Sequence, residues 1–291
     1  MGRLGRKLRC GGRACRSRCL VGFGGPVDDA TRSVIKSHQI DEWDNFPLAD
    51  WMGKLVGLPC ALGNDADVAG LAEALFGAAK GLSPVFYITI GSGIGGGLII
   101  GGAIYRGCGR GAAEIGHLTI LRDEISGCQR HLVELEASGW AMEERARAEA
   151  MHPGARTATL LRLAGGDRQK ITSKHVAEAA ALGDPLATEI LGHARHVLAD
   201  AICQVITLLC PRRIVIGGGV SLMGEDLLFG PLRQLVAERV FAPFATCYDI
   251  VPAQLGEEVV VHGALALARQ MVNPLKRPVS PTIGQENRRG T

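Results

Sequence analysis

The chain has 291 residues, of which 47% are hydrophobic and 40 are glycine, a composition typical of an α/β protein with many tight turns. No unbroken apolar run is long enough to span a membrane and no secretory signal is visible, so membrane and secreted proteins are excluded. Nine cysteines, an odd number without closely spaced pairs in the body of the chain, indicate reduced thiols in a cytoplasmic protein.

The formal net charge of +3 comes from one end of the chain. Residues 1–19 hold seven basic side chains and no acidic one, which leaves 25 basic against 29 acidic side chains in residues 20–291. A mildly acidic body argues against nucleic acid as a partner. Residues 1–19 form a basic leader that could be a nucleic-acid arm or a targeting segment. Its composition favours a translated, unselected reading frame, and we expect it to be disordered.

The first predicted elements lie between residues 20 and 79. They are a strand at 20–23 followed by a Gly-Pro turn, a helix at 49–56 that Gly57 ends, a strand at 59–62 and a helix at 67–79. Asn64 and Asp65 stand between this second strand and this second helix, where either residue can cap the helix. The pair therefore sits at a strand-to-helix junction, a place where a carboxylate can reach a ligand.

A glycine-dense segment follows the next predicted strand, residues 85–90. Five of the seven residues in 91–97, GSGIGGG, are glycine, which lets backbone N–H groups close around a phosphate. The segment matches the G-x-G-x-x-G dinucleotide fingerprint, but that fingerprint requires a helix directly afterwards. Residues 98–105 instead predict a strand, a two-glycine turn and a strand. A nicotinamide-dependent oxidoreductase remains an alternative only if residues 98–105 are helical.

The rest of the chain alternates predicted helices with strands. Helices are expected at 134–151, with a break at Ser138-Gly139, and at 174–182, 185–209, 226–240 and 258–271. A turn and a strand are expected within 113–121, and further strands are expected at 213–216, directly before three glycines, and at 247–252. Residues 273–291 contain three prolines and little apolar content, and we predict a disordered tail there.

Several polar residues are candidates for chemistry. The Asp65 carboxylate can take the proton of a sugar hydroxyl as that oxygen attacks a γ-phosphate, although an Asn64-Asp65 pair standing alone is more often a helix cap. Glu114 and His117 follow a glycine-rich loop, and Glu134 begins a helical segment. Taken singly, each of these three also fits an ordinary solvated residue.

Taken together, these motifs form an ordered series. Along the chain they run Asn-Asp, GSGIGGG, AAEIGH, E-x-x-ASG and IVIGGGVS, within roughly residues 20–271. This series resembles the ROK family (repressor, open reading frame, kinase) of sugar kinases and sugar-responsive repressors. The resemblance implies an actin-like ATPase (ribonuclease H-like) fold of two α/β domains with the active site in the interdomain cleft. The small domain would comprise residues 20–64 with helix 258–271, and the large ATP- and sugar-binding domain residues 65–257.

The resemblance also implies roles for single residues. Asp65 would be the catalytic base, and the sugar hydroxyls would be held by Asn64, Glu114, His117 and Glu134. ATP would be contacted by Gly91, Ser92, Gly93, Gly95, Gly217, Gly218 and Gly219. The implied partners are ATP with Mg²⁺, a hexose-type sugar and a second copy of the chain in a homodimer, with no membrane and no nucleic acid.

The chain departs from the family pattern in two places. Many relatives carry a Cys-x-Cys-Gly-x-x-Gly-Cys zinc cluster between the positions of His117 and Glu134, where this chain has a single cysteine, Cys128, so we expect no structural zinc. The family's first phosphate loop, an Asp-x-Gly-Gly-Thr-Lys-like motif, does not occur before residue 20. We therefore expect a truncated or misread form of a sugar kinase that binds sugar weakly and turns over little ATP.

The leading interpretation is a glucokinase-like kinase that phosphorylates a hexose or an N-acyl hexosamine with ATP. One alternative is a sugar-responsive transcriptional regulator of the same family. That role needs an N-terminal winged helix-turn-helix, for which residues 1–19 are too short and too rich in glycine. The other alternative is a catalytically inactive sugar-binding protein, which ATP turnover with a panel of sugars would distinguish.

Overall fold

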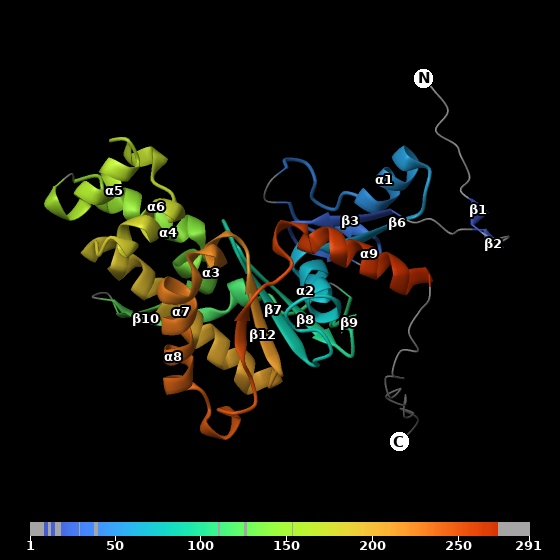
Figure 1. Ribbon diagram of the computed structural model, residues 1–291. Coiled ribbons are helices and arrows are strands. Elements are labelled where there is room, and N and C mark those ends of the chain that lie inside the picture. The colour runs from blue at the N-terminus through green and yellow to red at the C-terminus, as the bar shows by residue number, and fades with distance from the viewer. Residues whose placement is uncertain are drawn as a thin grey trace, which may run out of the picture.

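The computed structural model describes residues 9–10, 13–14, 19–28, 30–37, 40–109, 111–124, 127–152 and 154–272 of the chain. A five-stranded sheet in the order β13-β12-β7-β8-β9 lies at its centre (Figure 1). Its strands are β7 (Val85–Ile90), β8 (Ile94–Ile100), β9 (Ala103–Ile104), β12 (Arg213–Gly217) and β13 (Ile250–Pro252). β12 pairs in parallel with β7 and β13, whereas β7, β8 and β9 form an antiparallel meander.

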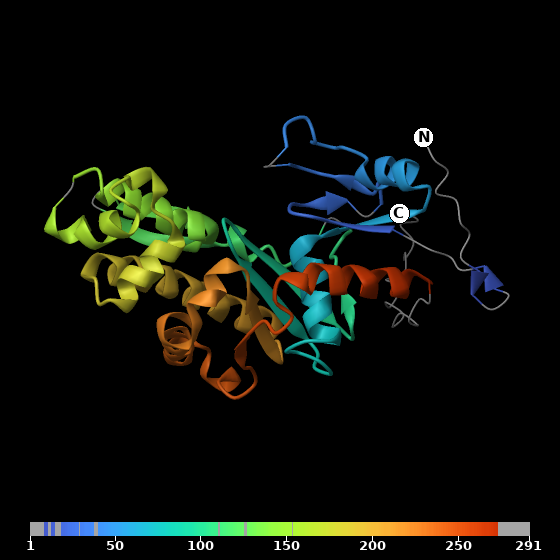
Figure 2. The ribbon, with the colours of Figure 1, turned by 45° about the horizontal axis from the view of Figure 1, so that its top comes forward.

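Both faces of this sheet are apolar, because successive side chains of a strand point to opposite faces. In β7, Phe86 and Ile88 belong to one hydrophobic core, and Val85 and Tyr87 belong to another. One long helix, α7, packs in the first core, and two helices, α2 and α9, pack in the second (Figure 2). These helices are α2 (Asp65–Leu75), α7 (Pro185–Leu209) and α9 (Val259–Val272).

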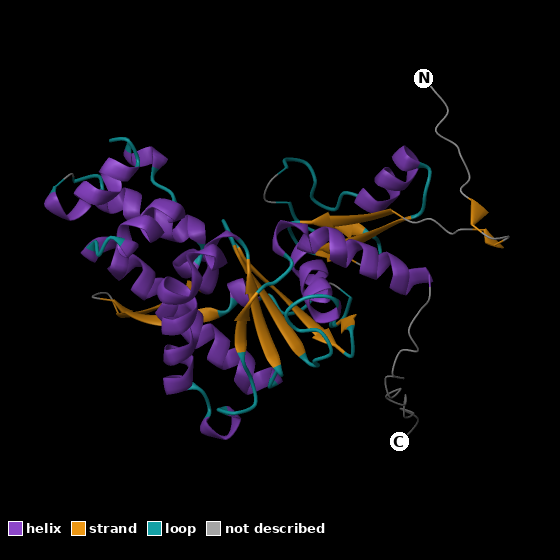
Figure 3. Cartoon of the chain, in the orientation of Figure 1, coloured by secondary structure: helices purple, strands orange, loops and turns teal. Residues whose placement is uncertain are grey.

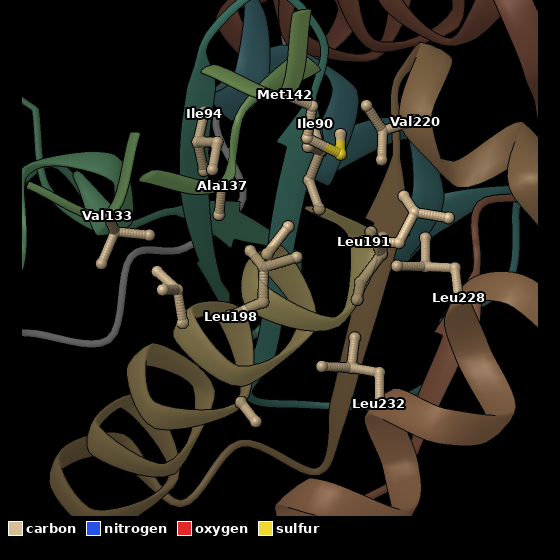
Figure 4. Packing of buried hydrophobic residues seen from close by; sticks show 14 of the residues in the cluster. Ile90, Ile94, Val133, Ala137, Met142, Leu191, Leu198, Val220, Leu228 and Leu232 are labelled. Atoms are coloured by element: carbon tan, nitrogen blue, oxygen red, sulfur yellow. The ribbon is translucent and has the colours of Figure 1, made fainter. Parts of the chain in front are cut away.

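The first core is the larger one and extends into a helical region beside the sheet. Figure 4 shows Ile90 and Ile94 of the sheet facing Leu191 and Leu198 of α7, with Met142 beside them. The region is built from α3 (Val133–Ala137), α4 (Gly139–Glu149), α5 (Ala158–Leu163), α6 (Ser173–Ala181), a π-helical turn η5 (Glu225–Phe229) and α8 (Gly230–Arg239). A two-stranded hairpin, β10 (Thr119–Glu124) and β11 (Gly127–Leu132), borders it.

A smaller lobe stands on the other side of α2 and α9 (Figure 3). Its strands β3 (Cys19–Phe23) and β6 (Cys60–Asn64) pair in parallel, and α1 (Leu48–Val56) packs against both. Gly57 ends α1 in the left-handed conformation that glycine adopts without strain. Short strand pairs complete the description: β1 (Arg9–Cys10) with β2 (Arg13–Ala14), and β4 (Val27–Asp28) with β5 (Ser33–Val34).

The structure confirms most of the predicted elements. Residues 98–105 form a strand, a glycine turn and a strand. The interpretation of residues 91–97 as a dinucleotide-binding fingerprint, which required a helix there, is therefore wrong. The predicted helix at 67–79 ends earlier, at Leu75, and the turn and strand predicted within 113–121 are a 3₁₀ turn η1 (Ile115–His117) followed by a strand that starts at Thr119. The sequence analysis missed β11, whose polar residues lack the β-branched pattern of a buried strand.

Two other expectations concern the ends of the chain. The tail 273–291 and most of the leader 1–19 lie outside the described residues. The division into a domain of residues 20–64 with 258–271 and a domain of residues 65–257 stays a prediction. Within the described ranges, no helix combines the length and the apolarity needed to cross a bilayer.

Candidate active site

Asp65 is the first residue of α2, and β6 delivers it there. The preceding Asn64 is the N-cap: its Oδ1 accepts hydrogen bonds from the N–H groups of Ala66 at 2.9 Å and Asp67 at 3.2 Å. Its Nδ2 donates to the carbonyl of Gly25 at 2.9 Å. Asn64 thus caps α2 and ties it to the Gly-Pro turn of the small lobe. The cap of the helix is therefore Asn64 and not Asp65.

The Asp65 carboxylate is half-buried, and one of its oxygens, Oδ1, accepts the Ala66 N–H at 2.7 Å. Burial raises the pKa of this carboxyl above its ordinary value, against the smaller, opposite effect of the backbone hydrogen bond. A carboxylate that is harder to ionise than usual is also a stronger base once it is ionised. The site therefore holds Asp65 in a form suited to accept a proton.

Asp65 lines a pocket of about 330 Å³. The turn Gly217–Gly219 at the end of β12 also lines this pocket, as do Tyr87 and Thr89 of β7. Gly218 has φ +84°, and a Cβ there would lie 2.5 Å from the carbonyl oxygen of Ile90. Glycine is therefore required at that position by both the backbone conformation and the close approach to β7.

The pocket is poor in positive charge. Among the described residues that line it, none is Lys, Arg or His, whereas Asp65 and Glu257 bring carboxylates. Its remaining lining includes Val259 and Val260 of α9. Such a pocket can hold an apolar ring beside its valines, and it can face a phosphate through backbone N–H groups, through hydroxyl groups such as that of Ser221, or through a bound cation.

Glu134, in the first turn of α3, braces the turn between β7 and β8. Its Oε2 accepts the N–H of Ile94 at 2.7 Å, and a Cβ on Gly93 would lie 2.5 Å from that same oxygen. The N–H of Gly139, at the start of α4, donates to the carbonyl of Gly91 at 2.8 Å. Two helices thus fix the turn Gly91–Gly93 from one side.

Glu114 and His117 belong to the segment around η1 that lies against β8. Glycines allow this contact: a Cβ on Gly96 would lie 2.2 Å from the carbonyl oxygen of Ala113, and one on Gly116 would lie 2.1 Å from that of Ile94. Ala113, directly before Glu114, has φ +68°, a strained conformation for a residue that carries a Cβ.

Glu114 brings the candidate residues together electrostatically. Desolvation raises the pKa of its carboxyl, the charge of His117 opposes that shift, and the charges of Asp65 and Glu134 add to it. A Cβ on Gly116, between Glu114 and His117, would lie 3.3 Å from the Cβ of Glu134, so this segment and the start of α3 are neighbours. Carboxylate, imidazole and amide groups arranged in this way can make several directional hydrogen bonds to a polyhydroxylated ligand.

Not all of the predicted phosphate contacts share the Asp65 pocket. Gly217, Gly218 and Gly219 line it, whereas Gly91, Ser92, Gly93 and Gly95 do not. Gly95 lies within β8, where a Cβ would meet the side chains of Ala66 and Thr89 at 3.3 Å each.

Several residues of this pocket were not among the predicted site residues, among them Tyr87, Thr89, Ser221 and Glu257. The alternation of β7 does carry a signal for Tyr87, because it points to the same face as Thr89.

The interval where relatives carry zinc ligands is the β10–β11 hairpin. There Glu136 of α3 bridges two imidazoles: its Oε1 lies 2.8 Å from His131 Nδ1, and its Oε2 lies 2.7 Å from His193 Nε2. In the part of the chain that the structure describes, no group of three or more His, Cys, Asp or Glu could hold a metal ion. The expectation that structural zinc is absent stays a prediction.

Comparisons with known proteins give a consistent result. The family model described as "ROK family" matches residues 12–271. Glucokinases from Thermotoga maritima and Streptomyces coelicolor are 32% and 34% identical to this chain, over 87% and 86% of it and over 80% and 79% of their own lengths. A solved structure of a ROK family glucokinase from Streptomyces griseus, in complex with glucose and AMPPNP, is 35% identical with a TM-score of 0.75, and the match covers 87% of this chain and 82% of that one.

Proposed function

The chain belongs to the ROK family, and we propose that it transfers the γ-phosphoryl group of ATP to a hydroxyl group of a hexose or an N-acyl hexosamine. The fold agrees with this activity, because it is the actin-like ATPase fold of ROK sugar kinases. One observation carries the proposal. Asp65 and the glycine turn Gly217–Gly219 line one pocket, and the charges of Asp65 and Glu134 both act on Glu114.

Asp65 would act as the general base. As the sugar oxygen attacks the γ-phosphorus, its O–H proton passes to the carboxylate, the new P–O bond forms, and ADP leaves with the electrons of the old one. A carboxylate whose pKa is raised by burial holds that proton better than an exposed one. Positioning and charge stabilisation, rather than covalent chemistry by the protein, supply most of the rate of such a transfer.

The sugar would lie among Glu114, His117 and Glu134, with Asn64 at the cap of α2. Glu134 has one carboxylate oxygen engaged by the N–H of Ile94, which orients the other oxygen for a ligand hydroxyl. Hydrogen bonds to several hydroxyls select a polyol over an apolar ligand. An apolar ligand would leave the polar groups of the site unpaired, which strongly disfavours its binding. Which sugar fits best is a matter for a binding panel.

The nucleotide would lie along Gly217–Gly219, with its ring beside the apolar residues of the pocket. Because the pocket carries two carboxylates and no cationic side chain among its described lining, its donor set suits Mg²⁺, which prefers oxygen ligands and is bound mainly through substrate phosphates. Glu257 is the side chain that would help to hold it, while Asp65 accepts the sugar proton, and the ion would neutralise the phosphate charge that this pocket cannot. We expect nucleotide binding to disappear when EDTA removes divalent cations, as measured by calorimetry.

A direct assay tests the proposal. The purified chain is incubated with Mg-ATP and either glucose, an N-acyl hexosamine or no sugar, and ADP and phosphosugar are quantified. Sugar-dependent, stoichiometric formation of both products is expected, and ADP release that is independent of sugar would contradict the proposal. The same assay measures whether turnover is as low as the sequence analysis expects, and sedimentation measures whether two copies associate as the family resemblance implies.

A further inference from the structure

Glu73 lies near the carboxyl end of α2, and its side chain is completely buried. A buried carboxylate is strongly unfavourable unless its oxygens receive hydrogen bonds. Here the partners are backbone N–H groups: Oε2 accepts from Ala78 at 2.7 Å, and Oε1 accepts from both Gln254 and Leu255 at 2.9 Å. The carboxylate therefore joins α2 to a segment that follows 181 residues later in the chain.

The segment that Glu73 holds is a wall of the Asp65 pocket. Residues 253–257 connect β13 to α9, and Ala253, Gly256 and Glu257 line the pocket. The helix that holds this wall at its last turns also carries Asp65 at its first residue, eight positions earlier, or roughly 12 Å along the helix axis. A single rigid element thus sets the separation between Asp65 and the wall.

A neighbouring glycine gives independent support. A Cβ on Gly77 would lie 2.1 Å from Glu73 Oε2 and 2.7 Å from its Cδ. Gly77 is not among the residues of positive φ, so its backbone would accept alanine. The carboxylate of Glu73, together with Leu255 Cγ at 3.0 Å, is what excludes a side chain at this position, rather than a turn.

The charge of Glu73 also reaches the pocket. Burial raises the pKa of the Tyr87 phenol, and the negative charges of Glu73 and Asp65 add to that shift. Tyr87 lines the pocket, and its hydroxyl oxygen would lie only 2.3 Å from a Cβ on Gly217. Glu73 does not line the pocket itself, but its charge acts on Tyr87, which does.

We propose that Glu73 is a positioning residue of the nucleotide site: its carboxylate fixes the 253–257 wall relative to Asp65 and thereby sets the affinity for ATP. This inference rests on the proposed function, which assigns the pocket to the nucleotide. The residue touches neither substrate nor Mg²⁺ and acts only through the wall that it holds.

Two variants test the role from different directions. Glu73→Gln keeps the size of the side chain but places an N–H₂ group against one of the three donors, and Gly77→Ala leaves Glu73 intact but displaces its carboxylate. The controls are Glu238→Gln, on the exposed face of α8, and Gly192→Ala in α7, where the added Cβ meets nothing closer than 3.7 Å. Calorimetry measures the Kd for AMPPNP with Mg²⁺ and for glucose, and hydrogen exchange measures protection of the amides of residues 254 and 255.

Both variants should lose amide protection at residues 254 and 255 and should bind AMPPNP roughly tenfold more weakly, with glucose affinity unchanged. Wild-type AMPPNP affinity in both variants would overturn the inference, even if exchange accelerates, because the carboxylate would then only stabilise the fold. An equal loss of glucose and AMPPNP affinity would overturn it too. If the unsubstituted chain binds glucose but no AMPPNP, the assignment of the pocket to a nucleotide fails, and this inference fails with it.

Discussion

The two sides of the candidate site are built by opposite means. On the side of Glu114, His117 and Glu134, the chain presents charged and polar side chains: burial and the charge of Glu134 raise the pKa of the Glu114 carboxyl, and the charge of His117 opposes that shift. On the side of Gly217–Gly219, the chain presents backbone without side chains, and Gly218 needs that absence to pass β7. The first side can select a ligand by hydrogen-bond pattern, and the second can only admit one by shape and by peptide dipoles. Asp65 stands where the two sides meet.

The largest effect on activity is expected from a substitution of Asp65 itself. Asp65→Asn keeps the size of the side chain and an oxygen that can accept the Ala66 N–H, but it cannot take a proton. We expect the turnover number to fall by about 10²–10⁴-fold relative to the unsubstituted chain, with the glucose Kd nearly unchanged. A coupled ADP assay and calorimetry measure the two quantities, and Asp226→Asn, at an exposed position, is the control. A fall of less than tenfold would show that another group accepts the proton.

A substitution of Glu134 tests the side of the site that is built from charged side chains. Glu134→Gln keeps a carbonyl oxygen for the N–H of Ile94 but removes the negative charge that would bind a sugar hydroxyl. We expect glucose to bind roughly ten- to a hundredfold more weakly and the AMPPNP Kd to stay within twofold of the unsubstituted value. A loss of AMPPNP affinity as large as that of glucose would place Glu134 in the nucleotide site instead.

On the side built from backbone we expect the reverse, a loss of AMPPNP affinity without a loss of glucose affinity. Substitutions of two neighbouring glycines distinguish an effect on binding from an effect on stability. Gly219→Ala adds a methyl group in open space within the pocket, so it should weaken AMPPNP binding by roughly tenfold while stability and glucose binding stay the same. Gly218→Ala places a Cβ at φ +84° and 2.5 Å from Ile90 O, so it should lower the free energy of unfolding by roughly 1–3 kcal/mol or more. Urea denaturation and calorimetry on both variants measure this. Equal stability losses would remove the distinction.

The same contrast explains what the sequence could reveal. The glycine turns, the hairpin after Ile90 and the junction at Asp65 are local, since each depends on neighbouring residues whose propensities agree. Glu73 gave no such signal, because two of its three hydrogen-bond partners lie 181 and 182 residues away and its role depends on a wall formed by another segment.

The role of Asn64 could be predicted from the sequence only in part. Its local role as a helix cap was one of two open choices and is now confirmed, whereas its contact with a sugar stays a prediction. The strand β11 was missed because its pairing partner, β10, supplies the stability that its own polar residues do not indicate.

The smallest expected effect concerns stability, and it follows from the ionisation of Asp65. The pKa of this carboxyl in the folded chain is raised above the ordinary value of 3.8, so the folded state binds the proton more tightly than the unfolded state does. The stabilising contribution of this group is therefore fully present below pH 3.8 and is lost as pH rises through the folded-state pKa. Above that pH, folding has to keep a charge in a place that disfavours it.

An asparagine at position 65 cannot ionise and escapes this loss. The difference in melting temperature between Asp65→Asn and the unsubstituted chain should be small near pH 3.5, should grow in favour of the variant as pH rises, and should be constant well above the raised pKa. Thermal unfolding in a series of buffers measures it, with Asp226→Asn as the control at an exposed position. A difference that shrinks with rising pH would mean that hydrogen bonds to the ionised carboxylate outweigh its burial. In that case Asp65 would be a stabilising residue of the junction, and the raised affinity for a proton on which its role as a base depends would be lost.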